Sequence, residues 1–165
     1  MAQTLTAHNL MLYDICNQIL KIDKSIRFAG FANKMGTIIA ARHRADLQHD
    51  SLEAPISLEK EKEQPLVTED ELELSAIESV LRMVTRKDMM SKLGKPIYSF
   101  TLYEKVKRAT ILLQNSNNSD SPYILMVSFD NKKGAVAYQE SIILNGILPF
   151  VSYYFRRASL FDLIF

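Results

Sequence analysis

The fold is decided by the stretch Ile26-Arg27-Phe28-Ala29-Gly30-Phe31-Ala32-Asn33-Lys34-Met35-Gly36-Thr37-Ile38-Ile39-Ala40-Ala41. Its first seven residues alternate between two faces, which is the period of an extended strand. A polar turn that ends at Gly36 separates them from a second run of strand formers, residues 37–41. Glycine takes a positive φ without steric cost, so Gly36 is the natural residue to close this loop. The stretch therefore predicts a β-hairpin.

Helical patterns lie on both sides of this hairpin. Apolar residues recur at three- and four-residue steps over residues 8–23, which predicts an amphipathic helix before it. After it, Thr68 and Glu71 form a T-x-x-E capping box that starts a second helix, and Gly94 ends that helix. Three runs of strand formers and a last helix follow, at 97–103, 105–114, 123–130 and 135–148.

Residues 44–66 follow neither the helical nor the strand period, and they contain a charged repeat closed by Pro65. We interpret them as a mobile charged linker inside a single α+β domain, residues 1–149. Residues 150–165 are interpreted as an aromatic C-terminal tail. The element order α-β-β-α-β-β-β-α then predicts the α+β class, with a five-stranded antiparallel sheet.

This order of elements resembles that of the profilin-like proteins, including roadblock and longin modules, with PAS and Cache sensors as more distant relatives. The resemblance implies that the first strand pairs with both the second and the fifth strand. Five sequence blocks also resemble an uncharacterised family of domains of unknown function common in ammonia-oxidising archaea: 26–31, 79–87, 92–95, 98–100 and 104–109. That family implies no activity, substrate or catalytic residue.

Composition limits the classes of function. With 20 basic and 19 acidic residues, the formal net charge of +1 removes the whole-chain electrostatic argument for a dedicated nucleic-acid binder. The single cysteine, Cys16, cannot form an internal disulfide, and we expect a cytoplasmic location. Its position on the apolar stripe of the first helix predicts a buried thiol rather than a nucleophile. The five glycines form no phosphate-binding loop, and we expect no catalytic residues and no cofactor.

One cluster has side chains of the kind that bind metal ions: His43, Asp46, His49 and Asp50. In a helix, three of them could share one face. The cluster lies at the entry to the polar linker, however, where such residues are normally solvated. We therefore predict no metal site.

Charge is distributed unevenly along the chain. Residues 50–78 contain ten acidic and two basic residues, a net charge of −8, whereas residues 82–108 contain eight basic and two acidic residues, a net charge of +6. Part of this pattern complements the dipole of the second helix. Five bases are candidates for one cationic site: Arg82, Arg86, Lys105, Lys107 and Arg108. Such a site would receive a carboxylate, a phosphate or the chain's own acidic segment, and a solvated surface is the alternative interpretation.

The apolar run 142–155 is shorter than the ~20 residues that a membrane-spanning helix needs. Three interpretations remain open: packing of the last helix on the sheet, peripheral membrane contact through residues 150–165, and cover by a partner subunit. We expect a non-enzymatic sensory or protein-interaction module that binds a protein partner or a small anionic ligand and forms a homodimer. The alternative is nucleic-acid or phosphate-ligand binding through the basic patch 82–108.

Overall fold

The computed structural model describes the sheet, the helices that flank it and two short helical pieces: residues 7–33, 35–44, 77–78, 92–94, 96–104, 106–115, 118–130 and 136–157. Apart from Arg44, the predicted linker 44–66 lies outside the described residues. Of the predicted second helix, residues 77–78 and 92–93 are described, and both pairs are helical. Gly94 follows with a φ of 81°, as expected for the glycine at a helix end.

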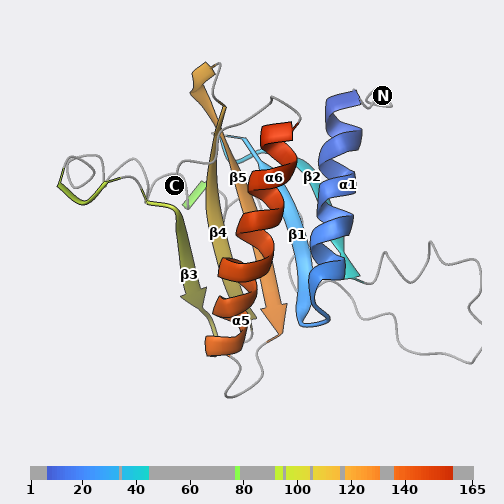
Figure 1. Ribbon diagram of the computed structural model, residues 1–165, viewed down its shortest axis with the longest axis vertical. Helices are drawn as coiled ribbons and strands as arrows, with labels where there is room; N and C mark the ends of the chain where they lie inside the picture. Colours follow the sequence, from blue (N-terminus) through green and yellow to red (C-terminus); the bar gives the residue numbers. More distant parts are fainter. Residues whose placement is uncertain are drawn as a thin grey trace, which may run out of the picture.

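A five-stranded antiparallel sheet forms the centre of the molecule, in the order β2-β1-β5-β4-β3 (Figure 1). Its strands are β1 (Ile26–Ala32), β2 (Ile38–His43), β3 (Tyr98–Leu102), β4 (Val106–Asn115) and β5 (Asn118–Asp130). β1 pairs with both β2 and β5, and β3 to β5 form a meander. The predicted α+β class and the predicted central pairing are confirmed, and β2 and β3 are the two edge strands.

The β1–β2 hairpin forms where it was predicted. The Asn33 side chain organises its turn, because its Oδ1 accepts hydrogen bonds from the backbone N–H groups of Met35 (2.8 Å) and Thr37 (3.0 Å). Gly36 has a φ of 85°, in the left-handed region that favours glycine. A Cβ atom at Gly36 would lie 2.2 Å from Cγ1 of Ile77, so close packing is a second reason for glycine here.

Two helical elements cover one face of the sheet (Figure 1). The first is α1 (Ala7–Ile22), which packs against β1 and β2. The second is a continuous C-terminal helix made of α5 (Val136–Ile142), the π-helical turn η1 (Ile143–Ile147) and α6 (Leu148–Arg157). Side chains from both helices and from the sheet form one buried apolar cluster, which includes Leu12, Ile19, Phe31, Phe129 and Phe155. We call this side the helix-covered face.

The last helix is longer than predicted. It continues past Leu148 to Arg157, so it carries the first half of the predicted aromatic tail into the domain. Val151 and Phe155 are fully buried, and the Phe155 ring meets the Phe31 ring edge-on with centroids 6.1 Å apart. Pro149 does not end the helix; the π turn η1 precedes it, where a proline interrupts helical bonding. Residues 158–165 of the predicted tail lie outside the described residues.

The β4–β5 hairpin is also longer than predicted. The sequence predicts strands over 105–114 and 123–130, but β5 begins five residues earlier, at Asn118, and Asn118 pairs with Asn115 of β4. Asn and Ser favour turns in isolation. Here the partner strand extends the ladder through them, with a register shift between Leu113 and Asn115.

The opposite face of the sheet carries a smaller buried cluster of apolar side chains: Phe28, Ala32, Ile124 and Met126. Alternate residues of a strand point to opposite faces. β4 therefore sends Ala109 and Ile111 to the helix-covered face, whereas Leu112 packs against the cluster on the opposite face. This alternation decides where the charged residues of β4 point.

Candidate functional site

The predicted basic patch is described only in part. Arg82, Arg86 and Lys105 lie outside the described residues, so their approach to one another stays a prediction. Lys107 and Arg108 are consecutive residues of β4 and therefore point to opposite faces, Lys107 to the helix-covered face. Both are largely buried, with 3% and 6% of their surface exposed. The strand period therefore places these two side chains on different faces, and the predicted site of five bases stays a prediction.

Arg108 lies on the opposite face between a tyrosine and an acidic residue. Its guanidinium group lies over the ring of Tyr103, 5.8 Å from the ring centroid. Burial lowers the pKa of Arg108, while Tyr103 and Glu78 oppose this shift by favouring the charged form. Glu78 belongs to the acidic segment 50–78. One carboxylate of the acidic segment thus lies near one base of the predicted patch.

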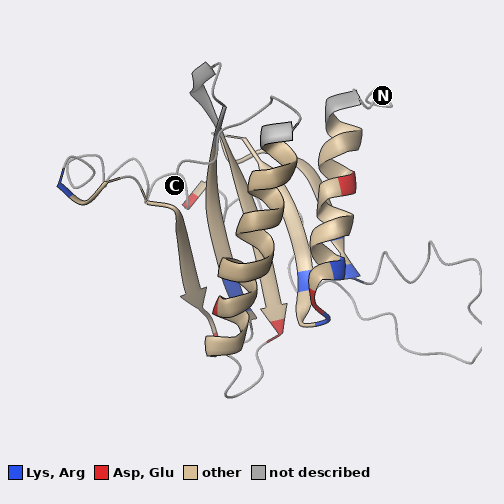
Figure 2. Cartoon of the chain, in the orientation of Figure 1, with Lys and Arg blue, Asp and Glu red and all other residues tan. Residues whose placement is uncertain are grey.

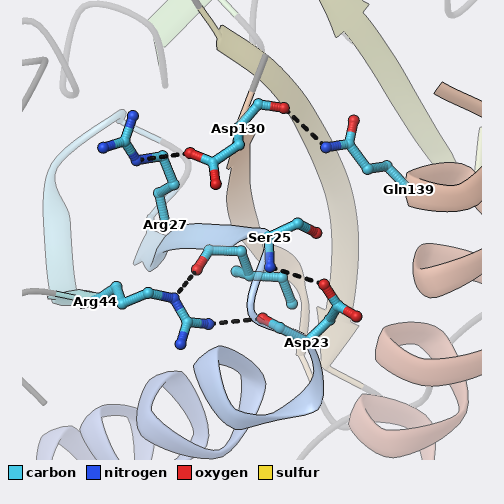
Figure 3. Close-up of polar contacts among 7 residues, drawn as sticks. Asp23, Ser25, Arg27, Arg44, Asp130 and Gln139 are labelled. Carbon is cyan, nitrogen blue, oxygen red and sulfur yellow. Dashed lines mark hydrogen bonds and ion pairs between the residues drawn. The ribbon is translucent and has the colours of Figure 1, made fainter. Parts of the chain in front are cut away.

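A polar cluster that the sequence did not reveal surrounds Arg44, directly after β2. Arg44 donates from Nε to the carbonyl of Ile26 (2.6 Å) and from Nη2 to the carbonyls of Asp23 (2.6 Å) and Leu20 (Figure 3). These three carbonyls belong to the end of α1, the α1–β1 turn and the start of β1. The hydrogen bonds of one side chain therefore link the end of β2 to the turn that precedes β1.

Asp130, the last residue of β5, extends this cluster across the sheet (Figure 3). Its carboxylate pairs with Nε of Arg27 (3.0 Å), and its backbone N–H donates to the carbonyl of Ser25 (2.9 Å). Its own carbonyl accepts a hydrogen bond from Nε2 of Gln139 (2.8 Å), a fully buried residue of α5. These polar groups bind the chain's own backbone and side chains. We therefore interpret the cluster as stabilising the fold rather than as a ligand site.

Asp23 has an additional partner on the C-terminal helix. Its Oδ1 accepts a hydrogen bond from the backbone N–H of Ser25 (2.7 Å), and its Oδ2 accepts one from the Tyr138 hydroxyl (2.5 Å). Burial alone would raise the pKa of the Asp23 carboxyl. The hydrogen bonds from Tyr138 and Ser25 outweigh burial and hold this pKa below its ordinary value of 3.8.

Neither the cysteine nor the histidine cluster shows a reactive arrangement among the described residues. Cys16 is fully buried, and burial raises the pKa of its thiol to about 12. The His43 ring packs against the Phe28 ring with centroids 4.9 Å apart. Its expected companions Asp46, His49 and Asp50 lie outside the described residues. In the described part of the chain, no group of three or more His, Cys, Asp or Glu residues could hold a metal ion.

The two edges of the sheet differ in charge. β2 carries Arg42, whose guanidinium group lies 5.4 Å from the ring centroid of Tyr13, and it leads directly into Arg44. β3 has the sequence Tyr-Ser-Phe-Thr-Leu and contains no charged residue. Leu102, at its end, is 57% exposed. Edge strands are normally protected from pairing with other chains by charges or bulges. The composition of β3 supplies no such protection.

Comparison with known proteins places the chain by its fold. No family model matches it, and no curated protein matches it. Among solved structures, the gliding protein MglB from Thermus thermophilus has a TM-score of 0.50 at 14% identity, covering 93% of this chain and 87% of that chain. An MglB structure with a tetrameric arrangement has a TM-score of 0.51 at 14% identity, covering 93% and 86%. A roadblock/LC7 domain from Streptomyces avermitilis has a TM-score of 0.46 at 8% identity, covering 85% and 97%.

At these identities the likeness concerns the fold alone. The expected α+β fold with a five-stranded antiparallel sheet is confirmed, whereas the resemblance to the archaeal family stays a prediction. The chain is similar in fold to MglB.

Proposed function

We propose that this chain is a non-enzymatic protein-interaction module that self-associates by pairing the edge strand β3 of two copies. The observation that carries the proposal is the uncharged β3 edge, whose terminal Leu102 is 57% exposed. Unpaired N–H and C=O groups along an uncharged edge are a template for another strand. The tetrameric arrangement of an MglB of similar fold is further support for self-association.

A two-fold symmetric pairing fits this edge. Two copies of one strand can pair antiparallel about a two-fold axis perpendicular to the sheet, so that the same patch is used on both subunits. The result is one continuous antiparallel sheet of two domains. At the other edge, Arg42 and the Arg44 cluster place positive charge where a second copy of β2 would approach, and like charges disfavour that pairing.

Binding of a further partner belongs to the same proposal. Arg108 lies near Glu78, so a carboxylate already accompanies the base that the opposite face carries among the described residues of the predicted patch. An acidic group of a partner protein or of a small ligand would replace Glu78 there. We also propose that the chain belongs to the archaeal family of domains of unknown function and that it has a sensory role. No single residue carries either part of the proposal.

The test places a charge on β3 and measures the mass of the assembly. Leu102→Glu and Ser99→Lys should shift the full chain from dimer to monomer in light scattering after size exclusion, because a charged side chain on an edge strand opposes its pairing with another strand. Thr37→Lys, at the entry to the other edge strand, is the matched control and should leave the mass unchanged. A wild-type protein that is monomeric at high micromolar concentration would refute the proposal, as would dimers that survive both β3 variants.

A further inference from the structure

The outer side of the edge strand β3 presents a defined set of backbone groups. Figure 2 shows this strand without Lys, Arg, Asp or Glu along its length. Directly after it, the backbone N–H of Tyr103 donates to the carbonyl of Val106 in β4 (2.8 Å), so the backbone groups of Tyr103 point inward. Successive residues of an antiparallel strand point these groups to alternate sides. The N–H and C=O groups of Tyr98, Phe100 and Leu102 therefore point outward, away from β4.

Several large apolar side chains are exposed, although none of the described helices is long and apolar enough to cross a membrane. Three of these side chains lie at the two ends of β3: Ile97 is 38% exposed, Leu102 is 57% exposed and Tyr103 is 41% exposed. Tyr103 lies on the opposite face, where Arg108 stacks over its ring, and the strand alternation places Ile97 on the same face. Leu102 points to the helix-covered face. Each face of the edge thus has exposed apolar surface for a partner to cover.

A symmetric pairing of two β3 strands has few possible registers. Opposite residues must point to the same face, and a two-fold axis perpendicular to the sheet keeps the faces of both copies aligned. The axis must therefore pass beside a residue that lies opposite its own copy, and Ser99, Phe100 and Thr101 are the central residues of the strand. Of these, the axis at Phe100 alone pairs all three outward-pointing residues with one another, because Tyr98 then lies opposite Leu102 of the second copy. Each such pair exchanges both of its hydrogen bonds.

The two neighbouring registers are less favourable. An axis one residue earlier places Pro96 opposite Leu102 of the second copy, and proline has no N–H to donate to a ladder. An axis one residue later places Glu104 opposite Tyr98 of the second copy. The hydroxyl of Tyr98 already donates to the Glu140 carboxylate (3.0 Å), so two carboxylates would approach each other.

We propose that the two-fold axis lies at Phe100 and that Ile97 of each copy packs against Tyr103 of the other. This inference rests on the β3 pairing proposed above and adds its register. Cross-strand pairs of aromatic and β-branched side chains stabilise a sheet, and Ile97 with Tyr103 is such a pair on the opposite face. On the helix-covered face, Leu102 packs against Tyr98 of the second copy. The exposed apolar side chains at both ends of β3 are then covered.

Disulfide cross-linking measures the register directly. Ser99→Cys and Thr101→Cys each add a thiol to β3, while the native Cys16 is fully buried. In the proposed register, position 99 lies opposite position 101 of the second copy in a non-hydrogen-bonded pair, whose Cα atoms are about 4.5 Å apart and within disulfide range. Oxidation of a mixture of the two variants, after exchange of subunits, should give a disulfide-linked heterodimer as the main covalent product. Each variant alone should remain without a disulfide.

The other outcomes separate the register from the pairing. A covalent homodimer from Ser99→Cys alone, or from Thr101→Cys alone, would move the axis to that residue and overturn the register while it supports β3 pairing. No covalent dimer from any of the three samples would overturn the β3 pairing itself. The wild-type chain is the control and should give no covalent dimer, because Cys16 is buried.

The dissociation constant of the dimer in sedimentation equilibrium tests the apolar contact. Ile97→Ala and Tyr103→Ala should each raise it by about tenfold, because the contact occurs twice in one dimer. The double variant should lose little more, since both substitutions remove the same contact. Leu93→Ala is the matched control: Leu93 is 76% exposed and lies outside the paired residues, so its dissociation constant should stay within about twofold of the wild-type value. An equal loss on Leu93→Ala, or losses for the first two variants that add in full, would overturn the contact. Circular dichroism checks that every variant is folded.

Discussion

The contribution of Arg44 to stability can be assigned to individual hydrogen bonds. It donates three hydrogen bonds to backbone carbonyls, those of Ile26, Asp23 and Leu20. A hydrogen bond from a charged group contributes about 1.5–3 kcal/mol, and its loss leaves a carbonyl without its partner. Arg44 is partly exposed, so water replaces part of this loss. We therefore expect Arg44→Ala to lower the free energy of unfolding by about 3 kcal/mol, or the melting temperature by roughly 6–12 °C for a chain of this size.

Urea unfolding followed by circular dichroism measures this difference. Arg44→Lys should recover about a third of the loss, because an ammonium group cannot reach three carbonyls in a fixed fork. Arg27→Ala is the matched control from the same cluster. It removes one ion pair to Asp130 from a side chain that is 43% exposed, and such pairs contribute about 0–1 kcal/mol. A change below about 1 kcal/mol for Arg44→Ala would contradict the reasoning.

Three further predictions concern the stability of the core, the dependence of stability on acid pH, and the reactivity of the Cys16 thiol. Phe155 is fully buried, so Phe155→Ala should lower the free energy of unfolding by about 3–5 kcal/mol. Removal of residues 150–165 should abolish cooperative unfolding. Urea unfolding measures both effects. Asp23 has a lowered pKa, so its contribution is present above its ordinary pKa of 3.8 and is lost as pH falls below that value. Asp23→Asn should therefore flatten the fall in stability with acid, as measured by melting temperature against pH. The Cys16 thiol, with a pKa of about 12, should react with iodoacetamide slowly in the native protein and rapidly in urea, followed by mass spectrometry; fast native labelling would mean that α1 opens readily.

The hairpin and the meander could be predicted because their signals are local. The strand period of residues 26–32 and the glycine at position 36 lie within one short stretch, and both appear in the structure as expected. The β1–β5 pairing has no such local signal. It joins residues about a hundred positions apart, and it was expected only from the resemblance of the element order to known architectures.

The Arg44 cluster could not be predicted because its acceptors are backbone carbonyls. Every residue carries a carbonyl, so no pattern of side chains marks Leu20, Asp23 and Ile26 as partners of an arginine 18 to 24 residues later. The opposite directions of Lys107 and Arg108, by contrast, were available from the sequence. Both lie in a predicted strand, and the alternation that identified the strand also separates consecutive bases.

The proposed β3 pairing fixes how the two copies are arranged. β3 runs from Tyr98, opposite Ile111, to Leu102, opposite Lys107. Antiparallel pairing of two β3 strands reverses the direction of the second copy, so Leu102 of each copy lies toward Tyr98 of the other. The two Leu102 side chains are then at opposite ends of the shared edge. A dimer in which the two Leu102 residues adjoin would show that the copies are arranged side by side, and the antiparallel β3 pairing would be wrong.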